Sequence, residues 1–406
     1  AFMTDRVVVV STDCHAGLPI AEYKPYVEKQ YHEMLDVAVP VQVEMMDKAE
    51  SSFLIKEVND AWRAPIKERL KGAWNYDERE RMLAADGIAA EIIFPDGITE
   101  QNTPPFGAGL GLSPREMVPE LQWAGAMAHN RWLVELCSND PERHIGVASI
   151  PLLWDVQKAV EAVRWCVENG LRAVMIPTMW CEHDPYHHVK YDPFWEACEA
   201  LGVIINFHSG PAPHPEFFGK DWPLEDQSDS LPGAMGIYVS EVMWWLYRPL
   251  TFMIWGGVFE RFPRLKAMIV EGGTMFMLPP WLRLLDHNYT DVQFSAKLGD
   301  FRSHLSMKPS DYFRRNCGIG ASCVPRSDLD LRNLIGTELI MWGSDFPHPE
   351  GTWPNTEQYY KDTFSNFPEE DGRKILGGNA MDFYQLNENH LQSIANNIGP
   401  KASLFH

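Results

Sequence analysis

The feature that most constrains the fold is a series of eight short apolar runs separated by segments of helical periodicity. Continuous apolar runs, without the alternation of a half-exposed sheet, are typical of strands buried on both faces of a parallel sheet. Eight strand–helix units predict an α/β fold, a (β/α)8 TIM barrel, with a doubly wound sheet as the structural alternative. We expect strands at 6–13, 90–95, 145–150, 173–177, 203–208, 266–271, about 313–319 and 339–345.

The segments between these runs carry helix start and stop signals. Asp155 precedes one helical pattern, and Asn169 and Gly170 follow it. The stretch from about 19 to 76 predicts a helical insertion after the first strand that covers the barrel mouth. We expect residues from about 388 to 406 to form a tail or an arm on a neighbouring molecule. The chain 1–406 is expected to form one barrel domain. We expect helices at 77–86, 119–138, 156–169, 193–201, 240–261, 279–287 and 326–335.

Charge and cysteine content exclude several classes of function. The chain has 35 Lys and Arg against 56 Asp and Glu, a net charge of −21, which argues against binding to nucleic acid or to an anionic membrane. Seven cysteines, an odd number with no CxxC motif, indicate a reduced, cytoplasmic protein rather than a disulfide framework. The longest apolar stretch, 243–259, contains Arg248 and Pro249 and is too short to span a membrane.

Ionisable residues stand where four of the apolar runs end. The first run ends in Asp13-Cys14-His15, and residues i and i+2 of a strand point to the same side. The fifth run ends in His208, the sixth in Glu271 and the eighth in Asp345. Active sites of such barrels are built at the carboxyl ends of the strands, so we expect these five side chains to face one mouth.

Each of these residues also has an ordinary structural explanation. Asp13 fits the start of a turn, His208 fits a strand end, Glu271 fits a helix N-terminus, and Asp345 fits a cap. As a group they are harder to explain in this way, because buried acids at one rim repel one another. A bound cation removes that repulsion, and carboxylate and imidazole are suitable ligands. The pattern therefore predicts a divalent metal site.

The sequence also resembles the amidohydrolase-related family, in the branch that contains metal-dependent decarboxylases and hydrolases. The matching stretches are 13–15, 191–195 through 207–210, 262–266 through 271–273, and 343–349, in the family's order and within residues 6–386. The resemblance implies a metal-dependent barrel enzyme. It implies that Asp13, His15, His208 and Asp345 hold the metal, and that the chain assembles as a homo- or hetero-oligomer.

The chain departs from the family pattern in ways that bear on the metal. Asp13 and Glu271 stand where many relatives have His, and no Lys ends the fourth strand to form a carbamylated bridge. The extra carboxylates favour manganese or iron over an all-nitrogen zinc site. They also leave room for a second ion held by Glu271 and His348, so we expect one or two Zn, Mn or Fe ions per chain. Of the histidines after the fourth strand, His183 and His188 are candidate substrate-binding residues, with a surface loop as the alternative.

Three functions are compatible with this sequence. The first is a hydrolase or non-oxidative decarboxylase of a small carboxylic or aromatic acid, in which Asp345 transfers a proton and His208 is a ligand and electrophilic helper. The second, suggested by the acid-rich ligand set, is a dinuclear non-haem Fe/Fe or Fe/Mn monooxygenase component with separate redox partners. The third is a non-catalytic barrel subunit. In each enzyme hypothesis the partner is a small-molecule substrate.

Overall fold

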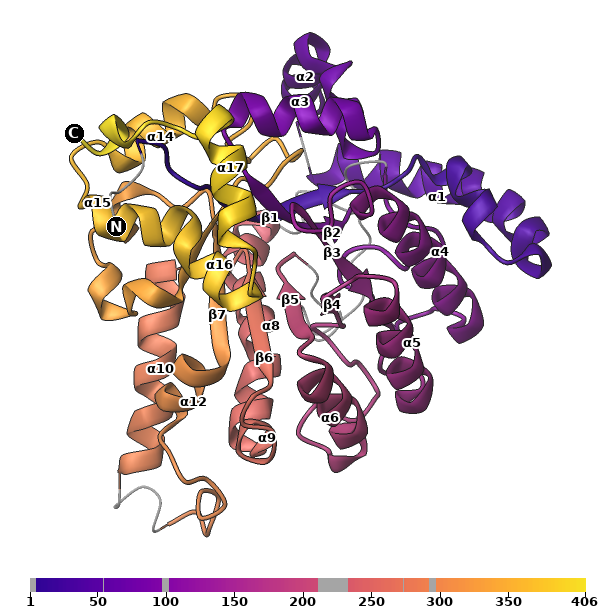
Figure 1. Ribbon diagram of the computed structural model, residues 1–406. Coiled ribbons are helices and arrows are strands. Elements are labelled where there is room, and N and C mark those ends of the chain that lie inside the picture. The colour runs from indigo at the N-terminus through magenta and orange to yellow at the C-terminus, as the bar shows by residue number, and fades with distance from the viewer. Residues whose placement is uncertain (1–4, 54, 97–101, 211–232, 273, 292–296) are drawn as a thin grey trace.

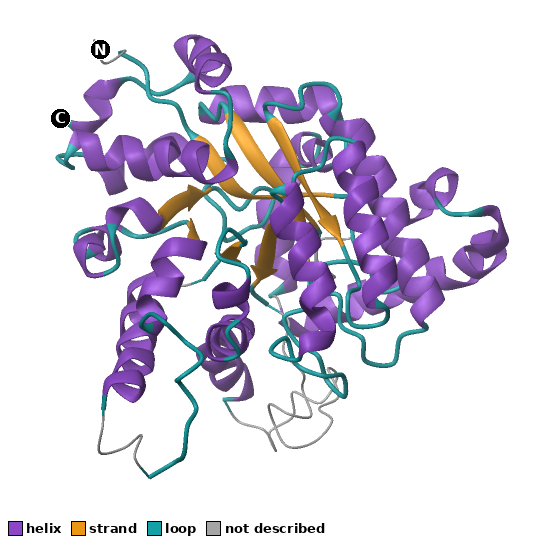
Figure 2. Cartoon of the chain, turned by 60° about the horizontal axis from the view of Figure 1, so that its bottom comes forward, coloured by secondary structure: helices purple, strands orange, loops and turns teal. Residues whose placement is uncertain are grey.

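Eight parallel strands, hydrogen-bonded in sequence order, form the centre of the protein and confirm the barrel prediction (Figures 1 and 2). The computed structural model describes all residues except 1–4, 54, 97–101, 211–232, 273 and 292–296. The strands are β1 (Val10–Ala16), β2 (Ala90–Pro95), β3 (His144–Ser149), β4 (Ala173–Met175), β5 (Ile204–His208), β6 (Lys266–Val270), β7 (Cys317–Ser322) and β8 (Ile340–Gly343).

Contacts between the first and last strands bring the sheet round into a barrel, which a doubly wound sheet would not do. The amide of Asp345 donates to the carbonyl of Asp13 at 2.8 Å, and the amide of His15 donates to the carbonyl of Phe346 at 2.6 Å. The hydroxyl of Thr12 adds a hydrogen bond to the carbonyl of Trp342 at 3.1 Å. These bonds hold the carboxyl ends of β1 and β8 together.

Helices surround the strands, and most lie where the sequence predicts them (Figure 2). The predicted helix at 240–261 is instead two helices, because Gly257 adopts a left-handed φ of 69° between them. The predicted seventh strand, at about 313–319, begins too early. The residues up to Asn316 form the end of a helix, and the strand begins at Cys317. The main helices are α3 (Tyr76–Asp86), α4 (Pro119–Cys137), α5 (Val156–Glu168), α6 (Asp192–Leu201), α8 (Ala234–Trp255), α9 (Val258–Arg261), α10 (Thr274–Thr290), α12 (Pro309–Asn316), α13 (Arg326–Leu329), α14 (Thr356–Phe364), α15 (Glu369–Arg373), α16 (Asn379–Tyr384) and α17 (Glu388–Ile398).

The insertion after β1 is helical, as predicted. It contains α1 (His32–Phe53), α2 (Lys56–Arg63) and short 3-10 turns, and α1 projects sideways from the barrel beside α4 (Figure 1). The side chain of Gln42 on α1 donates to the carbonyl of Pro104, in the loop after β2, at 3.2 Å. This hydrogen bond joins the insertion to a loop at the carboxyl ends of the strands. That the insertion covers the barrel mouth stays a prediction.

Residues 399–402 fold back onto the segment that precedes β1, while a role of the chain's end as an arm on a neighbouring molecule stays a prediction. The amide of Val7 donates to the carbonyl of Pro400 at 2.9 Å, and the side chain of Arg6 donates to the carbonyl of Gly399 at 2.6 Å. The amide of Ala402 donates to the carbonyl of Asp5 at 2.7 Å. The segment that leads into β1 is therefore held by the end of the chain.

A buried ion pair fixes the carboxyl half of β1 to its neighbours. Arg79 on α3 and Glu91 on β2 are both fully buried and form two hydrogen bonds of 2.6 and 2.8 Å. Arg79 also donates to the carbonyl of His15 at 3.0 Å, and His144 on β3 contacts the Glu91 carboxylate at 2.8 Å. Burial alone would raise the pKa of Glu91, but Arg79 and His144 outweigh it and lower the pKa to about 2.

Replacing Glu91 by Gln is expected to lower the free energy of unfolding by about 3–5 kcal/mol, because it leaves the Arg79 guanidinium buried without a counter-charge. Urea denaturation monitored by circular dichroism measures the change. Glu357→Gln is the control, since Glu357 pairs with Lys361 on the exposed face of α14 and should leave the unfolding midpoint unchanged. Equal effects of the two substitutions would contradict the structural role of the buried pair.

Candidate metal centre

All six residues that the sequence predicts as metal ligands meet at the carboxyl end of the barrel. Asp13 and His15 lie on β1, and His208 is the last residue of β5. Glu271 directly follows β6, while Asp345 and His348 lie in the segment after β8. The alternation of side chains along β1 places Asp13 and His15 on one side, as expected, whereas Cys14 contacts the hydroxyls of Ser11 and Ser344.

The six side chains form a continuous chain of short contacts. His15 Nε2 lies 3.4 Å from Asp13 Oδ1 and 3.3 Å from Asp345 Oδ1. His208 Nε2 lies 3.3 Å from the same oxygen of Asp13. His348 Nδ1 lies 3.0 Å from Asp345 Oδ1, and its ring stacks on His15 with centroids 4.0 Å apart. His208 Nδ1 lies 3.9 Å from Glu271 Oε2.

Irregular backbone at the strand ends aims these side chains. The pairing of β1 with β2 shifts register between Ser11 and Cys14, a local irregularity that surrounds Asp13. Glu271 has a φ of 59° and Asp345 a φ of 57°, values that a non-glycine residue rarely adopts. Strained backbone of this kind is concentrated at functional sites, where the surrounding structure holds it.

The donor atoms of the cluster fit a divalent cation. His15 Nε2 and both carboxylate oxygens of Asp345 are buried and have no hydrogen-bond partner. Buried polar atoms are normally paired, so atoms left in this state indicate a missing ligand. Three overlapping triads have donor atoms within 4.8 Å of one another: Asp13, His15 and His208; His15, Asp345 and His348; and Asp13, Glu271 and Asp345.

Without a cation, protons balance the charges of the cluster. Burial and the nearby His348 lower the pKa of His15, but the close carboxylates of Asp13 and Asp345 outweigh them and raise it to about 10. Burial would also raise the pKa of Asp13, yet His208 and His15 hold it well below its usual range. The pKa of Glu271 rises to about 7 because of burial and the Asp345 charge. The metal-free site therefore retains protons that a cation would displace.

Asp96 is a site residue that the sequence analysis missed. It is fully buried directly after β2, and its Oδ1 lies 3.2 Å from His348 Nε2. The two nitrogens of His348 thus face the carboxylates of Asp345 and Asp96. The rule that found the other residues, an ionisable side chain at the end of an apolar run, also applies to Asp96. Two serines were missed as well, Ser322 and Ser209, whose hydroxyls donate to the carboxylates of Asp13 and Glu271.

The two histidines predicted to bind substrate lie in the loop between β4 and α6. His183 packs edge-on against Trp154, with ring centroids 4.9 Å apart. His188 is exposed and its Nδ1 accepts a hydrogen bond from the amide of Lys190. Among the described residues, no hydrogen bond or ring contact joins either histidine to the six-residue cluster, and their binding role stays a prediction.

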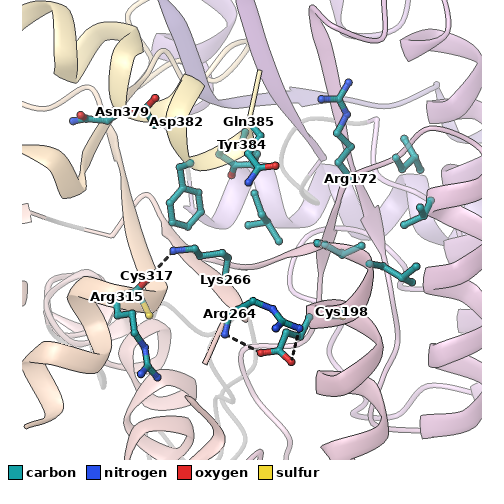
Figure 3. Close-up of a pocket in the computed structure, with 18 of the residues that line it drawn as sticks. Arg172, Cys198, Arg264, Lys266, Arg315, Cys317, Asn379, Asp382, Tyr384 and Gln385 are labelled. Atoms are coloured by element: carbon teal, nitrogen blue, oxygen red, sulfur yellow. Dashed lines mark hydrogen bonds and ion pairs between the residues drawn. The ribbon is translucent and has the colours of Figure 1, made fainter. Parts of the chain in front are cut away.

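A large cavity of about 1090 Å³ lies at the opposite end of the barrel (Figure 3). It is lined by the first residues of three strands, Ile204, Lys266 and Cys317. Lys266 donates to the carbonyl of Arg315 at 2.7 Å, and Arg264 interacts with the carboxylate of Glu199. Because catalysis in such barrels takes place at the carboxyl ends of the strands, this cavity is separate from the candidate active site.

A parallel eight-stranded barrel with an acid–imidazole cluster at its carboxyl end defines the class of metal-site TIM-barrel proteins. The amidohydrolase family model matches residues 60–386, and the chain belongs to this family. It is therefore a metal-dependent enzyme of the hydrolase or lyase kind. Within the described residues, no helix combines the length and apolarity needed to cross a bilayer.

Three similar proteins illustrate the range of the family. The 2-amino-3-carboxymuconate-6-semialdehyde decarboxylase of Dictyostelium discoideum is 25% identical over 336 residues, 80% of this chain and 80% of that protein. An amidohydrolase of Mycobacterium avium subsp. paratuberculosis has a TM-score of 0.68 at 19% identity, covering 94% of this chain and 100% of that one. A manganese-bound dihydroxybenzoic acid decarboxylase of Polaromonas has a TM-score of 0.59 at 19% identity, covering 96% and 99%.

Binding of Mn²⁺ is expected to strengthen with pH, because the proton on His15 must leave before its nitrogen can bind a cation. His15 stays protonated up to a pKa of about 10, so one proton is released per ion near pH 8. Glu271 has a pKa of about 7, and a second proton is released below that pH if Glu271 is a ligand. Isothermal titration calorimetry in buffers of different ionisation enthalpy counts these protons. Affinity that does not change from pH 6 to 8 would contradict this protonation of the site.

Asp96→Asn is expected to weaken Mn²⁺ binding about 10–100-fold, the usual effect of losing a carboxylate that orients a ligating histidine. The amide keeps the size of the side chain but removes the charge facing His348. Asp330→Asn, in an exposed ion pair with Arg326, is the matched control and should bind Mn²⁺ like the unmodified protein. Unchanged affinity of Asp96→Asn would show that His348 needs no orienting carboxylate.

Proposed function

We propose that this protein is a divalent-metal-dependent, non-oxidative decarboxylase of a small aromatic or unsaturated carboxylic acid. The observation that carries the proposal is the set of unpaired buried donor atoms of His15 and Asp345 at the mouth of an amidohydrolase barrel. The decarboxylase names of the relatives support this reaction over hydrolysis, and the manganese in the Polaromonas protein supports a divalent ion.

The primary metal ligands in this proposal are Asp13, His15, His208 and Asp345, with Glu271 and His348 at the edges of the site. A divalent ion bound there would draw electron density from the substrate carboxylate and fix its orientation. The mixture of carboxylate and imidazole ligands suits manganese or iron, and zinc with its common nitrogen and oxygen ligands is also accommodated.

The protein's own residues supply the proton that decarboxylation requires. When the bond between the ring carbon and the carboxylate breaks, carbon dioxide leaves and the carbon takes a proton in its place. In this proposal Asp345 delivers that proton from a carboxylate oxygen, next to the imidazole of His348. His348, 3.0 Å from Asp345 Oδ1, is the neighbour from which Asp345 can be reprotonated. His208 serves as a ligand and electrophilic helper.

Protein loaded with Mn²⁺ is expected to release carbon dioxide from a member of a panel of hydroxybenzoic and unsaturated dicarboxylic acids, and in D₂O to place deuterium on the former carboxyl carbon. Asp345→Asn should reduce the rate about 10²–10⁴-fold, because it removes the proton donor. Asp330→Asn is the control that should keep full activity. A coupled assay for carbon dioxide and mass spectrometry of the product measure both effects, and full activity of Asp345→Asn would refute its role.

The second candidate is the dinuclear iron or iron–manganese monooxygenase, with electron-transfer partners. Two overlapping triads of donor atoms favour it. The triad of His15, Asp345 and His348 extends beyond the triad of Asp13, His15 and His208, which leaves room for a second ion. The same preparations distinguish the two functions. A decarboxylase works without dioxygen and with manganese alone, whereas the oxygenase needs iron, dioxygen and a reductant, and consumes dioxygen with its substrate.

A further inference from the structure

Two neutral hydroxyl groups stand at the ends of two neighbouring strands, neither of which contributes to the metal cluster. The six clustered residues come from β1 and β5 or from the segments after β6 and β8. The strand β3 instead ends in Ser149, and Thr178 lies in the segment after β4. Both side chains are buried. The two hydroxyls therefore lie at the same end of the barrel as the metal cluster, on a different part of its rim.

The hydroxyl of Ser149 points into the barrel. On the same strand, Ile145 and Val147 belong to the apolar core inside the barrel, whereas Ala148 belongs to the core outside it. Because side chains alternate along a strand, Ser149 points inward as Ile145 and Val147 do. The amide of Ser149 donates to the side chain of Asn130 on α4 at 2.8 Å, and Asn130 donates to the carbonyl of Ser149 at 3.0 Å. These bonds fix the main chain of Ser149 and leave its hydroxyl unused.

Neither hydroxyl has a hydrogen-bond partner in the part of the chain that the structure describes. Ser149 Oγ and Thr178 Oγ1 are both buried and unpaired. Buried hydroxyls elsewhere in the protein are paired, as in the case of Thr356, which donates to the carboxylate of Asp86 at 2.6 Å. Burial of an unpaired hydroxyl is unfavourable, and a buried polar atom without a partner indicates a missing ligand. At this end of the barrel, the expected ligand is the substrate.

An aromatic side chain packs against both the metal cluster and the wall formed by β3 and β4. Phe94, near the end of β2, lies with its ring centroid 5.1 Å from that of His208 and 6.2 Å from that of His15. It belongs to the same apolar core as Val147 on β3 and Met175 on β4. An aromatic residue in this position suits a substrate ring, because contacts between rings are favourable. The barrel end thus combines a charged region, an aromatic side chain and a neutral hydrogen-bonding region.

We propose that Ser149 and Thr178 bind a ring hydroxyl of the substrate, so that the protein selects hydroxylated aromatic acids. The inference rests on the proposed function, in which the substrate carboxylate lies at the metal cluster. A single ring hydroxyl satisfies both side chains, because it donates to one oxygen and accepts from the other. A second carboxylate would fit less well, since neither hydroxyl supplies the positive charge that a buried anion requires.

Calorimetric titration of the Mn²⁺-loaded protein with phenylphosphonate and its 2-, 3- and 4-hydroxy derivatives tests this contact. The phosphonate replaces the carboxylate and cannot lose carbon dioxide, so binding is measured without turnover. At least one hydroxy derivative is expected to bind about tenfold more tightly than phenylphosphonate, the usual effect of one or two additional hydrogen bonds. Ser149→Ala and Thr178→Val should each reduce this advantage and leave the affinity for phenylphosphonate unchanged. Thr363→Val, at a buried threonine of α14, is the matched control and should keep the full advantage.

Three results would overturn the proposal. The first is the absence of binding, or equal binding of all four phosphonates to the unmodified protein. The second is an advantage that survives both substitutions, and the third is an equal loss of affinity for all four compounds, because a lost hydroxyl contact affects only compounds that carry a hydroxyl. The carbon dioxide assay tests the proposed function separately. Selective binding of a hydroxy derivative without release of carbon dioxide from any hydroxybenzoic acid would overturn the decarboxylase and leave the hydroxyl contact in place.

Discussion

Electrostatic repulsion among buried carboxylates is the constraint on which the functional end of this barrel depends. Asp13, Asp345 and Glu271 stand at the ends of three strands, and each lies close to an imidazole of the same cluster. In the metal-free protein a proton on His15, and one on Glu271 below about pH 7, reduce the negative charge. A divalent cation would provide the same compensation while freeing those protons, which links metal content to the protonation of the site.

A second, separate set of charges stabilises the barrel wall behind this cluster. The Arg79–Glu91 pair is neutral as a unit and fully satisfied by hydrogen bonds, so it needs no external ion. The pair is nevertheless connected to the metal centre, because Arg79 donates a hydrogen bond to the carbonyl of His15. One residue of β1 is thus fixed through its main chain by a structural ion pair and presents its side chain to the functional cluster.

The sequence predicted the barrel and six of the clustered residues because both depend on local patterns. Apolar runs predict buried strands. The residue that ends such a run must lie at the carboxyl end of its strand, as His208 and Glu271 do. Asp96 escaped notice because it opens a long loop, and its partner His348 is 252 positions away. The start of β7 was misplaced because Phe313 is apolar and lies just before the strand, yet residues 313–316 form the last turn of α12. The fold-back of residues 399–402 onto the chain's start depends on long-range hydrogen bonds that no local pattern records.

The order in which the chain is made has a consequence for how the cluster is completed. Asp13 and His15 pair with Asp345 and Phe346, which are synthesised more than 300 residues later. During translation, the early half of the site therefore lacks its partners until the segment after β8 has been made. A cation that needs ligands from both β1 and this segment can meet its full set of ligands only once the barrel has closed.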